Sequence, residues 1–159
     1  MKRFFIVFAL LVVGIGTLYS QNLPSWVRVG MTKTEILQRI DDWIIPNEIY
    51  DNMENPNLFG YSNKNWLTVS FNVDPVRGLE QVFISGGILN DLSFSNTISD
   101  FTNRYGQPRI RSTDIYYFNR NLPNDVEMIM VTRIRNIAHQ SSNDSAEVVY
   151  FLRGTFYIN

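Results

Sequence analysis

The sequence predicts an α+β fold in which an antiparallel sheet carries two helices packed on one face. Only two segments have the start and stop signals of a helix, whereas most of the remaining chain alternates apolar and polar residues with the two-residue period of a strand. Aromatic residues make up 14% of the chain and gather in these strand-like runs, where they suit a pleated, half-buried surface. Runs of strands interleaved with only two helices are typical of the α+β class.

The first twenty residues have the layout of a secretory signal peptide. A positive start, Lys2-Arg3, precedes an unbroken apolar run from Phe4 to Val13, and the residues up to Ser20 are small or turn-prone. The apolar run is shorter than the ~20 residues that a spanning helix needs, so we expect cleavage rather than retention as a membrane anchor. The sequence leaves the cleavage site open, after Gly16 or after Ser20.

Cleavage of this segment leaves residues 21–159, a size typical of one domain. The chain contains no cysteine, which excludes disulfides, thiolate metal sites and a lipid anchor on cysteine. We therefore expect a periplasmic or extracellular protein without a lipid anchor. The mature part keeps 12 of the 14 basic residues against 15 acidic ones, and a net charge of about −3 does not suit a nucleic-acid partner.

The first helix is predicted from about Thr32 to Trp43. Thr32-Lys33-Thr34-Glu35 matches the capping box, in which the threonine hydroxyl and the glutamate carboxylate each accept a hydrogen bond from the other residue's backbone N–H. Ile36 and Ile40 then recur at helical spacing. Trp43 continues this series, which predicts a core position for its indole.

A clear strand follows at residues 66–73, where every second residue from Leu67 to Val73 is apolar. Trp66 lies on the other face, among polar residues. Asp74-Pro75-Val76-Arg77-Gly78 predicts a turn, and Leu79 to Ser85 is the returning strand.

The second helix is predicted after Ser95, because Ile98, Phe101 and Tyr105 recur at spacings of three and four residues. Gly106-Gln107-Pro108 provides its stop signal. Three further strands are predicted at residues 115–118, 126–134 and 147–152.

These elements predict two α-β-β-β units, at about residues 24–87 and 92–159. A duplication would place equivalent strands at a constant offset, but the offset drifts from about 57 residues between the first strands to about 67 between the third. The sequence therefore supports a shared architecture of the units better than a shared ancestry.

The start of the first unit carries a family resemblance. The stretch Val27-Arg28-Val29-Gly30-Met31-Thr32-Lys33-Thr34-Glu35-Ile36-Leu37 resembles the opening of the SmpA/OmlA and β-lactamase-inhibitor-like group of exported proteins, which share a Gly-Met-Thr-x-x-Glu-[Val/Ile] helix start. The resemblance implies a small exported module that binds protein, as an envelope scaffold in some members and as an enzyme inhibitor in others. The scaffold members are typically lipoproteins, and the absence of cysteine argues against that role. No inhibitory residue can be carried over.

No catalytic, metal or cofactor site is predicted. His139 is the only histidine and stands beside a polar loop, so the usual nucleophile–base arrangements are missing. Asp41-Asp42 are adjacent and point about 100° apart on a helix. The acids Glu48, Asp51 and Glu54 lack the spacing of a calcium loop.

Aromatic and arginine side chains are the better functional candidates. The predicted binding residues are Trp66, Tyr116, Tyr117, Arg133 and Arg135, and a cationic patch with Arg109 and Arg111 is a further hypothesis. We expect a non-enzymatic module that binds another envelope or secreted protein through an aromatic-bearing sheet face. The alternatives are a carrier of a small apolar or glycan ligand in a helix–sheet pocket and, more remotely, a carboxylate-based hydrolase. The sequence leaves the partner and the oligomeric state open.

Overall fold

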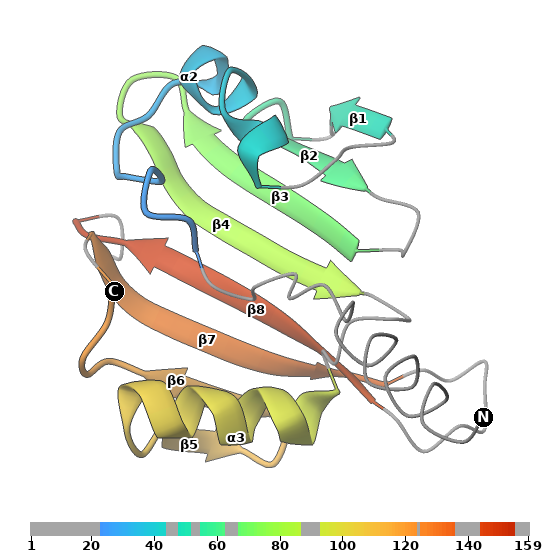
Figure 1. Ribbon diagram of the computed structural model, residues 1–159, viewed down its shortest axis with the longest axis vertical. Helices are drawn as coiled ribbons and strands as arrows, with labels where there is room; N and C mark the ends of the chain where they lie inside the picture. Colours follow the sequence, from blue (N-terminus) through green and yellow to red (C-terminus); the bar gives the residue numbers. More distant parts are fainter. Residues whose placement is uncertain are drawn as a thin grey trace, which may run out of the picture.

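The fold is α+β, with one eight-stranded antiparallel sheet (Figure 1). The computed structural model describes residues 23–43, 48–51, 55–62, 67–86, 93–123, 125–135 and 144–154. The elements in these ranges are α2 (Lys33–Leu37), the 3-10 helix η1 (Ile40–Asp42), β1 (Glu48–Asp51), β2 (Leu58–Ser62), β3 (Leu67–Asp74), β4 (Gly78–Gly86), α3 (Phe94–Tyr105), β5 (Arg109–Ser112), β6 (Ile115–Phe118), β7 (Val126–Ile134) and β8 (Ser145–Leu152).

The strands follow the order β1-β2-β3-β4-β8-β7-β6-β5 across the sheet. Each half is therefore a four-stranded meander, and the last strands of the two meanders, β4 and β8, pair at the centre. The prediction of three strands after each helix is not confirmed, because each helix is followed by four. The additional strands are β1 and β5, four residues each, which lie at the two edges of the sheet.

Helices α2 and α3 cover the same face of the sheet. Residues directly opposite each other on neighbouring strands share a face, and the register builds one such row from Phe59, Phe71, Val82, Tyr150, Ile129 and Phe118. At one end of this row the ring of Trp43, which follows η1, lies 6.3 Å from the ring of Phe71. At the other end, Phe101 of α3 lies 5.7 Å from Phe118 and 6.5 Å from Tyr150.

The first helix is shorter than the predicted span from Thr32 to Trp43. Its capping box is confirmed: Thr32 Oγ1 accepts from the Glu35 backbone N–H at 3.2 Å, and Glu35 Oε2 accepts from the Thr32 N–H at 2.8 Å. The α-helix nevertheless ends at Leu37, because the Arg39 N–H bonds to the Ile36 carbonyl three residues back and the φ of Arg39 is −121°. A turn of 3-10 helix then brings Trp43 to the core edge, as its spacing predicted.

Helix α3 agrees closely with its prediction. It buries Phe94, Thr97, Phe101 and Tyr105, which form one stripe at spacings of three and four residues. It ends at Gly106, whose φ of 82° is easy for glycine and costly for other residues.

The segment before α2 fills the space between the two helices. Its apolar side chains Leu23, Val27 and Met31 belong to the core, and the Leu23 backbone N–H donates a hydrogen bond to the Tyr150 hydroxyl. The Gly30 N–H donates to the Leu79 carbonyl at 3.1 Å, and the Leu79 N–H donates to the Met31 carbonyl at 2.8 Å. These bonds hold the segment against β4, next to the turn between β3 and β4.

None of the helices in the described part of the chain has the length and apolarity that a membrane span requires.

Candidate functional site

Among the residues that the structure describes, no helix lies on the opposite face of the sheet, and we call it the helix-free face. Its positions alternate with the core positions along each strand. The central ones, all at least partly shielded from solvent, are Ser70, Asn72, Gln81, Phe83, Ser85, Ile115, Tyr117, Met128, Met130, Thr132, Glu147, Val149 and Phe151.

An apolar ridge crosses this face from β4 to β6. The register sets Phe83 opposite Val149, Val149 opposite Met130, and Met130 opposite Tyr117. Val149 is 1% exposed and Phe151 is 9% exposed, yet neither belongs to the core cluster on the helix side. Strand β8 is thus apolar on both sides, a pattern typical of strands that are covered on both faces.

The β3 side of the helix-free face is polar and composed of small or amide side chains. Ser70 stands opposite Phe83, and Asn72 Nδ2 donates to Gln81 Oε1 at 3.3 Å. The face therefore combines an apolar half with an uncharged hydrogen-bonding half, as protein-binding surfaces do.

Glu147 is the one carboxylate on the central positions of this face. The register places it between Ser85 of β4 and Thr132 of β7. Burial raises the pKa of its carboxyl above the usual 4.5, since loss of water disfavours the charged form. Within the described residues no cationic side chain forms an ion pair with it.

Glu147→Gln is expected to raise the melting temperature at neutral pH. A raised folded-state pKa means that folding favours the protonated form, so the contribution of Glu147 is greatest below pH 4.5 and is lost as the pH rises through the folded-state pKa. Thermal unfolding from pH 4 to 8 should therefore show the gain in the variant mainly at the upper end. Glu127→Gln is the control, because the Glu127 carboxylate accepts from the Gly154 N–H at 3.0 Å. An equal rise in the melting temperature of both variants would show that the gain does not come from the burial of the Glu147 carboxyl.

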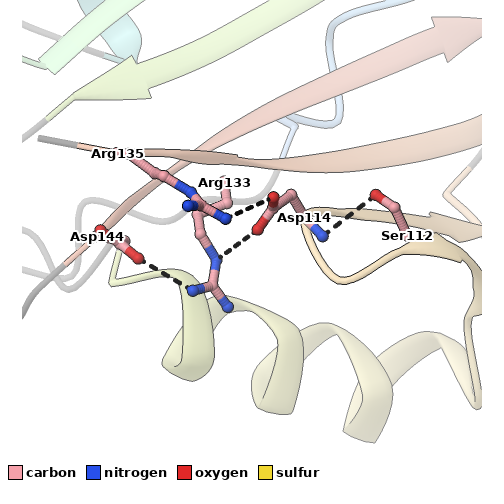
Figure 2. A network of polar contacts seen from close by, with 5 residues as sticks. All are labelled: Ser112, Asp114, Arg133, Arg135 and Asp144. Carbon is pink, nitrogen blue, oxygen red and sulfur yellow. Dashed lines mark hydrogen bonds and ion pairs between the residues drawn. The ribbon is translucent and has the colours of Figure 1, made fainter.

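Arg133 lies on the other face, at the centre of a polar network (Figure 2). Its Nη1 donates to Asp144 Oδ2 at 3.0 Å, and its guanidinium carbon lies 4.4 Å from the ring centre of Phe94. Its Nε is 3.1 Å from Asp114 Oδ1; both atoms are shielded from solvent, and their geometry is that of an ion pair rather than a hydrogen bond. Arg135 Nη2 donates to Asp114 Oδ2 at 2.9 Å. The network joins β7, the turn between β5 and β6, the start of β8 and the start of α3.

The structure separates the predicted binding residues. Tyr117 lies on the helix-free face, whereas Tyr116 lies on the helix side with its ring 5.5 Å from Phe94. Arg133 and Arg135 are neutralised by carboxylates, so their contacts favour a structural role. Trp66 lies outside the described residues, and so does His139.

Sequence reasoning missed Phe83, Met130 and Val149 as members of a surface. Each belongs to an apolar stretch, which is typical of the core. The one sequence feature that indicated a second apolar face is that β8 is apolar at consecutive positions. Which of two apolar faces meets the helices depends on pairing across the sheet.

A groove of about 390 Å³ lies at the start of α2. Its lining includes Thr32, Lys33, Phe59, Val73 and Val76, and the Lys33 ammonium lies 4.8 Å from the ring centre of Phe59. The volume is in the range of small-ligand sites. It differs in place from the predicted helix–sheet pocket, because neither Tyr116 nor Tyr117 lines it.

In the described parts of the chain, no group of three or more His, Asp or Glu side chains is close enough together to hold a metal ion.

Searches against protein-family models, curated proteins and solved structures find no match for this chain. The resemblance to the SmpA/OmlA and β-lactamase-inhibitor-like group therefore stays a prediction.

Proposed function

We propose that this protein is an exported, non-enzymatic binding module that contacts another protein through its helix-free face. The observation that carries the proposal is the apolar ridge of Phe83, Val149, Met130 and Tyr117, which lies on the sheet face that carries neither helix. Phe83, Met130 and Tyr117 are partly exposed and Val149 is buried. A contiguous apolar patch with a polar surround is characteristic of interaction sites.

The composition of the ridge favours a protein as the ligand. Aromatic side chains and methionine are enriched at the centres of protein interfaces, and charged side chains are depleted there. The ridge combines Phe83, Tyr117 and Met130, and Glu147 is the single charge among the central positions. A broad sheet face also offers a wide, shallow contact, which suits a protein better than a small molecule.

Export rests on the sequence of residues 1–20, and it places the partner in the periplasm, in the outer envelope or outside the cell. We also propose that the halves at residues 24–87 and 92–159 act as two structural units. The ridge then lies at their junction, since Phe83 belongs to the first unit and Val149 to the second.

The test begins with capture of the partner on the tagged protein from native envelope extract. The dissociation constant for the purified partner is then measured with a Met130→Ser/Tyr117→Ser variant. We expect binding to weaken by about 30-fold or more, because the loss of even one central interface residue can cost about 2 kcal/mol. Melting curves establish that the variant remains folded.

Ile110→Ser is the matched control. It also replaces an apolar residue with serine, but Ile110 is 65% exposed and pairs with Tyr116 on the helix side. It should bind with unchanged affinity. Equal binding by all forms would reject the helix-free face as the contact. A small molecule released on denaturation, without a protein partner, would favour a carrier that uses the α2 groove, and turnover abolished by one Asp or Glu substitution would favour a hydrolase.

A further inference from the structure

The two edges of the sheet carry opposite charge. Strand β1 at one edge reads Glu-Ile-Tyr-Asp, with an acidic residue at each end (Glu48–Asp51). Strand β5 at the other edge reads Arg-Ile-Arg-Ser, and all four of its residues are exposed (Arg109–Ser112). Among the described strands, β1 pairs with β2 alone and β5 pairs with β6 alone.

The two edges also run in opposite directions. All seven strand pairings are antiparallel, so direction alternates across the eight strands and β1 is antiparallel to β5. A second copy placed edge to edge, with its helices on the same side, therefore continues the antiparallel pattern. Alternate backbone N–H and C=O groups of an edge strand point outward and are available for such pairing.

The charges select one pairing among the three that are geometrically available. Two β1 edges repel each other, and so do two β5 edges, whereas β1 and β5 attract. In the described residues no carboxylate pairs with Arg109 or Arg111, and the Arg111 guanidinium donates only to the Tyr117 hydroxyl at 3.4 Å. Between these arginines Ile110 is 65% exposed, which adds apolar surface to the contact.

We infer that a second copy of this chain docks by placing its β1 strand antiparallel against β5, which extends the sheet from one molecule to the next. A register that sets Ile49 opposite Ile110 brings Glu48 opposite Arg111. The contact is head-to-tail, so it repeats along an open-ended row or closes into a ring. A β-bulge after Ile110 keeps the pairing short, so the association is weak and salt-dependent.

Sedimentation velocity on the purified protein tests this inference, in the form that accumulates in its native host. At ~0.05 M salt the weight-average sedimentation coefficient should rise with protein concentration, and at ~0.5 M salt the rise should largely disappear, because exposed charges are screened. Arg109→Glu/Arg111→Glu and Glu48→Lys/Asp51→Lys should each weaken self-association by about tenfold or more.

Mixing the two charge-reversed variants is the decisive arm. The first has two acidic edges and the second has two basic edges, so neither should self-associate but the mixture should recover association. Arg28→Glu/Arg153→Glu is the control for the arginine reversal, since it changes the net charge by the same amount at residues outside β1 and β5, and it should associate like the unchanged protein. A monomer at all concentrations and salts would overturn the inference. So would association that both reversals leave intact, or a mixture that stays monomeric.

Discussion

Gly78→Ala should lower the free energy of unfolding by about 3 kcal/mol or more. The φ of Gly78 is +77°, in the left-handed region that costs a residue with a Cβ atom about 1–2 kcal/mol. A Cβ atom built at this position would lie 2.3 Å from the Gly30 carbonyl oxygen and 2.7 Å from the Gly30 Cα. Both contacts are to backbone, so no side chain can move aside, and overpacking of this kind costs about 1–3 kcal/mol in addition.

The Gly78→Ala substitution should also disturb the segment before α2, outside the turn itself. Relief of the clash requires the segment before α2 to move, and this segment is held by the Gly30 and Met31 hydrogen bonds to Leu79. Its side chains Val27 and Met31 are 4% and 3% exposed, so a shift also loosens the core. We expect the variant to unfold at a lower denaturant concentration with an unchanged slope.

Gly154→Ala is the matched control for this prediction. The φ of Gly154 is +80°, but a Cβ atom there meets nothing within 4 Å. Only the conformational cost remains, about 1–2 kcal/mol. If denaturant unfolding finds Gly78→Ala no less stable than Gly154→Ala, the close approach of Gly78 to Gly30 does not constrain the fold.

Phe101→Ala should cost about 3–5 kcal/mol, the range for deletion of a buried phenylalanine ring. Phe101 is 0% exposed and joins α3 to two strands of the sheet. Its ring lies 5.7 Å from Phe118 of β6, 6.5 Å from Tyr150 of β8 and 5.4 Å from Tyr105 of its own helix. Removal of the ring therefore detaches α3 from the sheet and leaves a cavity among aromatic side chains.

Val76→Ala provides the comparison, because Val76 is 93% exposed at the tip of the turn between β3 and β4. This substitution should change the free energy of unfolding by less than about 0.5 kcal/mol. Equilibrium unfolding in urea, with fluorescence and circular dichroism recorded together, measures both variants. Similar stability of the two variants would show that α3 does not depend on Phe101 for its attachment.

The turn at residues 74–78 shows how a local sequence signal becomes a rigid structure. Asp74 Oδ1 accepts from the Arg77 and Val76 backbone N–H groups, each at 2.8 Å, and these bonds lower the pKa of the Asp74 carboxyl. Pro75 and Gly78 complete the turn that their positions predicted. The clash that makes Gly78 irreplaceable, however, comes from Gly30, which lies 48 residues earlier in the chain.

The candidate site was only partly predictable. Neighbouring residues of a strand point to opposite faces, so Tyr116 and Tyr117 could not both line one surface, yet the sequence alone did not show which of them faces away from the helices. The arginines of the predicted cationic patch are divided in the same way. Arg133 and Arg135 meet Asp114 and Asp144, whereas Arg109 and Arg111 lie on an exposed edge strand.

The sequence by itself determined the elements whose signals are local. Capping at Thr32, the glycine stop at Gly106 and the strands at residues 115–118 and 126–134 depend on a few adjacent residues, and each appears where it was expected. The α+β class follows from the same local periodicities.

Only the tertiary structure decided which residues meet across the sheet. The pairing of β4 with β8 joins residues more than 60 positions apart, and that pairing assigns one apolar face to the helices and the other to the ridge. The edge strands β1 and β5 likewise exist because β2 and β6 offer them unpaired backbone groups. Pairing between strands that are far apart in the chain is set by the folded sheet and not by the residues of one strand, so the helix-free face and the charged edges could be identified only from the tertiary structure.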